Sequence, residues 1–97
     1  MTLNEAEARG RSEIRISVRN FARQMEERLQ QNDWKGGWQD DAAGDLFNHL
    51  VEEVGEIAEL LRDPKAIYDD VLGECADAAN MAMMVAEQFS TPLRSGS

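Results

Sequence analysis

The second half of the chain opens with the stretch DLFNHLVEEVGEIAELLR, residues 45–62, whose apolar residues recur every three or four positions. This spacing is typical of an amphipathic helix, because residues three and four apart share one helical face. Asp63 precedes Pro64, and the residue before a proline avoids helical geometry. The stretch therefore predicts a helix over about 45–62 that buries its apolar arc against a partner.

The same periodicity predicts two more helices and no strand. One covers about 13–31 with a single apolar stripe, and another begins between Ala66 and Asp70 and runs to about Phe89. The last helix is apolar on nearly every side, so we expect it to be buried and the bundle to be completed by oligomerisation. The expected fold is all-α, a small antiparallel helical bundle. It forms one domain over residues 1–97, ordered over about 12–89, with flexible termini that include a loose tail from Ser90.

Composition limits the classes of function. The chain has 97 residues, 42% of them hydrophobic, which suits one folded domain. Its formal net charge of −9 argues against a general nucleic-acid or anionic-membrane binder. No apolar run approaches the roughly 20 residues of a membrane span, and residues 1–10 lack the apolar region of a signal peptide. With a single cysteine, Cys75, the simplest expected location is the cytoplasm.

Carboxylates gather in two short clusters. The first has the pattern E-E-x-x-E and the second E-x-x-D, and both lie in predicted helices. Like charges three and four apart on a helix repel one another, so such clusters need a cationic partner. The five residues are Glu52, Glu53, Glu56, Glu74 and Asp77.

A divalent cation is the partner that the sequence favours. The second half of the chain carries only three basic residues, Arg62, Lys65 and Arg94, too few to pair with five acids. Mg²⁺ prefers oxygen ligands, keeps several waters and takes substrate phosphate oxygens as well. A di-iron carboxylate site is disfavoured, because it needs Glu-x-x-His twice and the chain has one histidine.

Helical rotation separates the roles of the five acids. At about 100° per residue, Glu53 lies beside the apolar arc and Glu56 lies about 60° further round. If the two helices pack antiparallel, this pair faces Glu74 and Asp77 and forms an oxygen cage for metal. Glu52 points further away and is the candidate to orient or deprotonate a water that the metal has made more acidic.

The segments NHLVEEVGEIAEL (48–60) and ECADAANMA (74–82) resemble the MazG-like all-α nucleoside triphosphate pyrophosphohydrolases. The family signature is E-E-x-x-E, a spacer and E-x-x-D, and here 17 residues separate Glu56 from Glu74. The resemblance covers roughly residues 14–89. It implies Mg²⁺-dependent hydrolysis, with Mn²⁺ as a substitute, between the α- and β-phosphates of a (deoxy)nucleoside triphosphate. It also implies a house-cleaning role and a homodimer or dimer of dimers.

Carried over by position, the resemblance assigns metal binding to Glu53, Glu56, Glu74 and Asp77. Glu52 then matches the first glutamate of the motif, near the metals, as a possible base.

Five further residues are candidates for the nucleotide. Lys35 is placed to bind phosphate, and Trp34 or Trp38 to stack on a base. His49 and Asn80 face the carboxylates and could contact base, sugar or phosphate. Each also has a plain alternative: a solvated lysine, tryptophans packed on the core, and polar residues that fill space.

Two other functions compete with this hypothesis. The small size and the apolar last helix also suit a non-catalytic acidic helical interaction module. Within the same superfamily, the alternative is a phosphoribosyl-ATP pyrophosphohydrolase.

Overall fold

The computed structural model describes residues 13–33 and 36–96, with side chains as far as residue 89. The described residues form three α-helices and no strand: α2 (Ile16–Asn32), α3 (Ala43–Arg62) and α4 (Tyr68–Gly96). The all-α prediction is therefore confirmed. None of these helices has the length and apolarity needed to cross a membrane.

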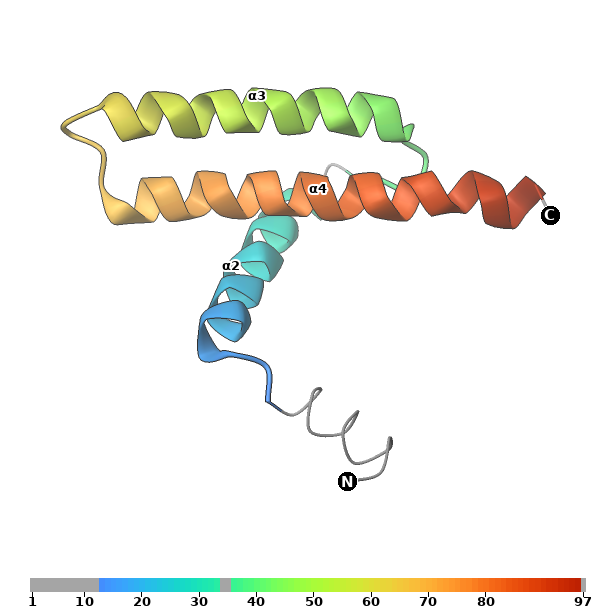
Figure 1. Cartoon of the computed structure of the whole chain (residues 1–97), viewed down its shortest axis with the longest axis horizontal. Coiled ribbons are helices and arrows are strands. Elements are labelled where there is room, and N and C mark those ends of the chain that lie inside the picture. Colours follow the sequence, from blue (N-terminus) through green and yellow to red (C-terminus); the bar gives the residue numbers. More distant parts are fainter. Residues whose placement is uncertain (1–12, 34–35, 97) are drawn as a thin grey trace.

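Helices α3 and α4 form an antiparallel hairpin, and α2 crosses α4 at a steep angle (Figure 1). The two helices of the hairpin pack along one another, whereas α2 contacts α4 and not α3 within the described chain. The predicted antiparallel pairing of the two carboxylate-bearing helices is confirmed. Its consequence is that residues near the end of α3 lie opposite residues near the start of α4.

A tight turn joins the two helices of the hairpin. The backbone N–H of Asp63 bonds to the carbonyl of Leu60, and the Asp63 carboxylate accepts the N–H of Lys65 at 2.9 Å. The backbone of Asp63 is extended and no longer helical, as expected for the residue before Pro64. This turn sets the register that brings the carboxylate clusters together.

Helix α4 is longer than the sequence predicts. It continues to Gly96, so the expectation of a loose tail from Ser90 is wrong for residues 90–96. Extending an existing helix adds one backbone hydrogen bond for each residue fixed.

The buried residues of α4 form a stripe with a spacing of four: Ala76, Asn80, Met84 and Gln88. Two of these residues are polar, and both bind backbone carbonyls of earlier segments. The Asn80 side chain donates to Met25 of α2 at 2.9 Å. Gln88 donates to the carbonyls of Gln39 and Asp41 at 2.7 and 2.8 Å. Polar contacts thus attach α2 and the following loop to the hairpin.

The apolar core of the single chain is small. Leu46, Ala76 and Met84 are the buried apolar residues of the described chain, and of these only the small Ala76 is completely inaccessible. Much of α4 is only half-buried, although its sequence is apolar on nearly every side. The outer face of α3 also carries an exposed apolar stripe, 52–72% accessible, made of Phe47, Val51, Val54 and Leu61.

The Asn80 contact generates a stability prediction. Substitution of Asn80 by Ala removes the bond to α2, and we expect the free energy of unfolding to fall by about 1–3 kcal/mol. Urea denaturation followed by circular dichroism measures the change. The control is Asn48→Ala, which removes an exposed amide from α3 and is expected to change stability by less than about 0.5 kcal/mol. Equal effects of the two substitutions would contradict a structural role for Asn80.

Candidate metal centre

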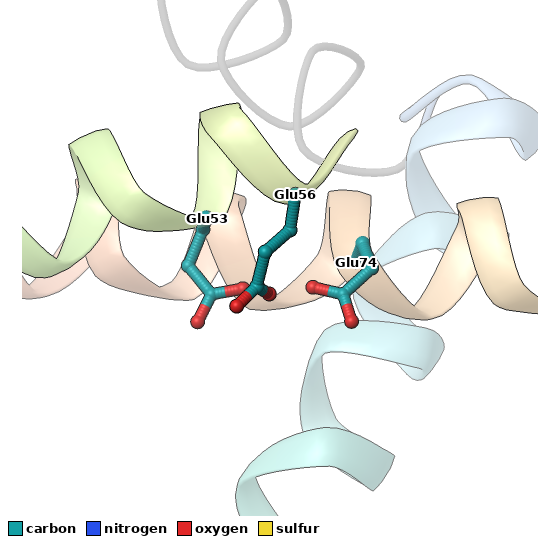
Figure 2. Close-up of side chains that lie close together, drawn as sticks. All are labelled: Glu53, Glu56 and Glu74. Atoms are coloured by element: carbon teal, nitrogen blue, oxygen red, sulfur yellow. The ribbon is translucent and has the colours of Figure 1, made fainter. Parts of the chain in front are cut away.

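Three glutamates from two helices converge in the hairpin. Glu53 and Glu56 come from α3 and Glu74 from α4, and their carboxylates point toward one another (Figure 2). One oxygen of each lies within 4.8 Å of the other two. The cause is local: residues three apart share a face of α3, and antiparallel packing presents that face to α4. These three residues are called the glutamate triad below.

The triad is poor in hydrogen-bond donors. The Oε2 atoms of Glu53 and Glu74 are buried and have no hydrogen-bond partner. Burial is the largest of several effects that together raise the pKa of Glu74 to about 8. The carboxylates of Glu56 and Glu53 add to this shift, because they can bond to Glu74 only when it keeps a proton. Burial likewise raises the pKa of Glu53. Without a cation, ionisation of all three glutamates of the triad is therefore unfavourable.

A hard divalent cation fits this donor set. Oxygen ligands, partly buried negative charge and unpartnered oxygen atoms are what such ions satisfy. Two oxygens bound to one Mg²⁺ at about 2.1 Å can be at most about 4.2 Å apart. The 4.8 Å limit of the triad is slightly larger, a difference that rotation of the glutamate side chains can close.

Asp77 lies outside the triad and is paired with Arg28 of α2. Arg28 Nε donates to Asp77 Oδ1 at 2.8 Å, and Nη2 donates to Oδ2 at 2.6 Å. The expectation that basic residues are too few to pair with the five acids is wrong for Asp77, because it considered only the second half of the chain and Arg28 lies in the first. The role of Asp77 as a metal ligand stays a prediction.

Arg28 is the functional candidate that the sequence analysis missed. It follows Phe21 by seven residues and Met25 by three, so it lies on the apolar stripe of α2. A cation on a stripe that faces the rest of the protein needs a partner. The position of Arg28 on this stripe was the feature of the sequence that could have identified it.

The predicted base lies apart from the triad. Glu52 is exposed on α3, where its carboxylate lies 3.7 Å from Nδ1 of His49, which is exposed as well. Both residues line a separate depression near the start of α3. The structure therefore does not bring Glu52 and His49 together with the triad.

The predicted nucleotide-binding residues are dispersed. Asn80 is buried against α2, as described above, which fits its structural alternative. The Trp38 indole N–H donates to the carboxylate of Glu87 at 2.9 Å. Trp34 and Lys35 lie outside the described residues.

A groove runs beside the triad at the end of the hairpin where α3 meets α4. Its volume is about 390 Å³. Two triad members, Glu56 and Glu74, form part of its wall, and Arg28 reaches it from α2. The described lining residues are Arg28, Glu56, Glu59, Leu60, Asp63, Asp69, Asp70, Gly73 and Glu74.

Comparison with other proteins leaves the site to be interpreted from its own chemistry. No family model, curated protein or solved structure matches the chain.

The triad predicts a pH dependence of stability. The pKa of Glu74 is about 8 in the folded protein against an ordinary value of 4.5. Between these values the folded chain binds more protons than the unfolded chain, so this contribution to stability is complete below pH 4.5 and is lost as pH rises through 8. We expect the metal-free protein to melt at a lower temperature at pH 8 than at pH 5.5. Thermal unfolding in a chelating buffer measures this.

Glu74→Gln removes the titrating group and should flatten that pH dependence. Glu59→Gln, an exposed glutamate of α3, is the control and should preserve it. An unchanged slope in Glu74→Gln would show that the triad is not the source.

Proposed function

We propose that the chain is a Mg²⁺-dependent nucleoside triphosphate pyrophosphohydrolase of the MazG-like type. It would convert a (deoxy)nucleoside triphosphate to the monophosphate and pyrophosphate. The observation that supports this most directly is the glutamate triad, whose buried oxygens lack donors. A metal that binds there still needs ligands, and phosphate oxygens and water are those that Mg²⁺ usually takes.

In this proposal Glu53, Glu56 and Glu74 hold the metal, and the adjacent groove receives the phosphates. Mg²⁺, or Mn²⁺ in its place, would supply charge neutralisation and a more acidic bound water. Asp77 is the proposed further ligand. Glu52 stays the proposed base on the strength of the motif alone, because its exposed carboxylate lies beside His49 and apart from the triad.

The nucleoside side of the proposal depends on the loop before α3. Trp38 is half-buried and is held to Glu87 of α4 through its indole N–H, and its proposed role is to stack on a base. Trp34 and Lys35 remain proposed contacts to base and phosphate. A house-cleaning role and a cytoplasmic location belong to the same proposal.

The hydrolysis prediction compares a glutamate of the triad with an exposed glutamate outside the groove. Each common ribo- and deoxynucleoside triphosphate is incubated with Mg²⁺, and monophosphate and pyrophosphate are separated by ion-exchange chromatography. Glu56→Gln removes a triad carboxylate, and we expect the rate to fall at least about 100-fold. Glu27→Gln changes an exposed glutamate of α2 that does not line the groove, and its rate should stay within about threefold of the unmodified chain. Equal rates for both variants would remove the triad from the mechanism.

An interaction module is the second candidate, favoured by the exposed apolar stripe of α3. It predicts that the triad binds no Mg²⁺. Titration calorimetry with Mg²⁺ and Mn²⁺ separates the two functions, because only the hydrolase requires metal binding that Glu56→Gln abolishes. A phosphoribosyl-ATP pyrophosphohydrolase would bind metal too, and direct assay of that compound distinguishes it.

Self-association is part of the proposal. The single chain buries few apolar residues, while Phe47, Val51, Val54 and Leu61 line one exposed face of α3. A second copy of the chain can cover this face by packing the same stripe against it. We therefore propose a homodimer or a dimer of dimers.

The assembly prediction is a change in molar mass. Light scattering after size exclusion should give at least twice the 10.9 kDa of one chain. Val54→Glu places a charge in the middle of the stripe, which two copies would bury, so we expect it to shift the mass toward 10.9 kDa. Asn48→Glu adds the same charge on α3 outside the stripe and should leave the mass unchanged. A dimer that survives Val54→Glu would contradict this interface.

A further inference from the structure

Arg28 uses only two of its three guanidinium nitrogens to bind Asp77. Nε and Nη2 make the two bonds to that carboxylate. The remaining nitrogen, Nη1, makes only a long 3.5 Å contact with the side chain of Gln31, which is exposed. The side chain of Arg28 is 34% accessible, so one edge of a fixed guanidinium remains available to a ligand.

That edge lies at the wall of the groove. Arg28 lines it together with Gly73 and Glu74. A Cβ atom placed on Gly73 would lie 3.4 Å from Nη1. Nη1 therefore rests against the bare backbone of α4, one residue before a member of the triad.

The charge of Arg28 is unusual in this place. The other charged residues that line the groove are six carboxylates, and Arg28 is the one cation among its described lining residues. Arginine presents its N–H groups in a rigid planar fork that suits phosphate as well as carboxylate. One side of the Arg28 fork holds Asp77, and the other lies against Gly73, which also lines the groove.

We propose that Arg28 is a phosphate-binding residue. Asp77 fixes the guanidinium through Nε and Nη2, and the Nη1 edge donates to an oxygen of a polyphosphate chain whose other oxygens bind metal at the triad. This proposal rests on the proposed function. It adds a residue of α2 to a site otherwise built from α3 and α4.

Inorganic tripolyphosphate tests the proposal, because it carries the phosphates and no base. Its dissociation constant is measured by calorimetry in excess Mg²⁺ for the full chain. Arg28→Gln should weaken binding at least about 10-fold, the effect of losing a hydrogen bond to a charged group. Arg28→Lys should also weaken binding, because a single ammonium group cannot hydrogen-bond to Asp77 and to a phosphate in the positions that the planar guanidinium occupies. Arg23→Gln removes the same charge from an exposed position of α2 and should stay within twofold.

A separate titration with Mg²⁺ alone distinguishes a phosphate contact from support of the metal site. Affinity for Mg²⁺ should be unchanged or tighter in Arg28→Gln, since a nearby positive charge has been removed. Loss of Mg²⁺ binding in a folded Arg28→Gln would overturn the proposal, as would tripolyphosphate binding within twofold of the unmodified chain. If Arg28→Gln does not fold, Arg28→Lys decides by the same criterion.

The binding test of Arg28 does not depend on whether the chain hydrolyses a nucleotide. A chain that binds Mg²⁺ and tripolyphosphate but cleaves no nucleotide would refute the proposed function, while the comparison of Arg28 variants would still decide the role of Arg28. A chain that binds no tripolyphosphate in excess Mg²⁺ would overturn that role.

Discussion

The ion pair between Arg28 and Asp77 ties α2 to the hairpin. Bidentate bonds of a guanidinium to a carboxylate are short and directional, and here they are 2.8 and 2.6 Å long. Hydrogen bonds to charged groups contribute about 1.5–3 kcal/mol, and the 34% exposure of Arg28 places this pair toward the lower end. Because the apolar core is small, such directional contacts have a large share in orienting α2. They also bring Arg28 to the wall of the groove.

Local periodicity predicted that Glu53 and Glu56 face Glu74 and Asp77, and the structure brings the three glutamates together while pairing Asp77 with Arg28. Glu53 and Glu56 share a face because they are three residues apart, and the short turn before α4 leaves antiparallel packing as the direct route back. Glu74 then meets them across the hairpin. These relations depend on helical geometry and a short connection, both of which are legible in the sequence.

Contacts between distant segments were not predictable in the same way. Arg28 and Asp77 are 49 residues apart, as are Trp38 and Glu87. The second contact depends on the path of the loop after α2, and the first depends on the angle at which α2 crosses α4. No spacing rule gives that angle for a single crossing helix, because side-chain packing selects it. Asn80 shows the result: rotation placed it on the carboxylate side of α4, yet its amide binds the backbone of Met25.

Charge couples the two halves of the proposed site. The groove is acidic and a triphosphate is an anion, so the two repel each other unless cations neutralise part of the charge. Metal bound at the triad would raise the affinity for phosphate, and phosphate would raise the affinity for metal by the same factor. Protons compete with the metal, because Glu74 must lose its proton to become a ligand and its pKa is about 8 in the metal-free chain. As pH rises, repulsion among the ionised glutamates of the triad lowers the stability of the metal-free fold. Relief of the same repulsion favours cation binding at the triad.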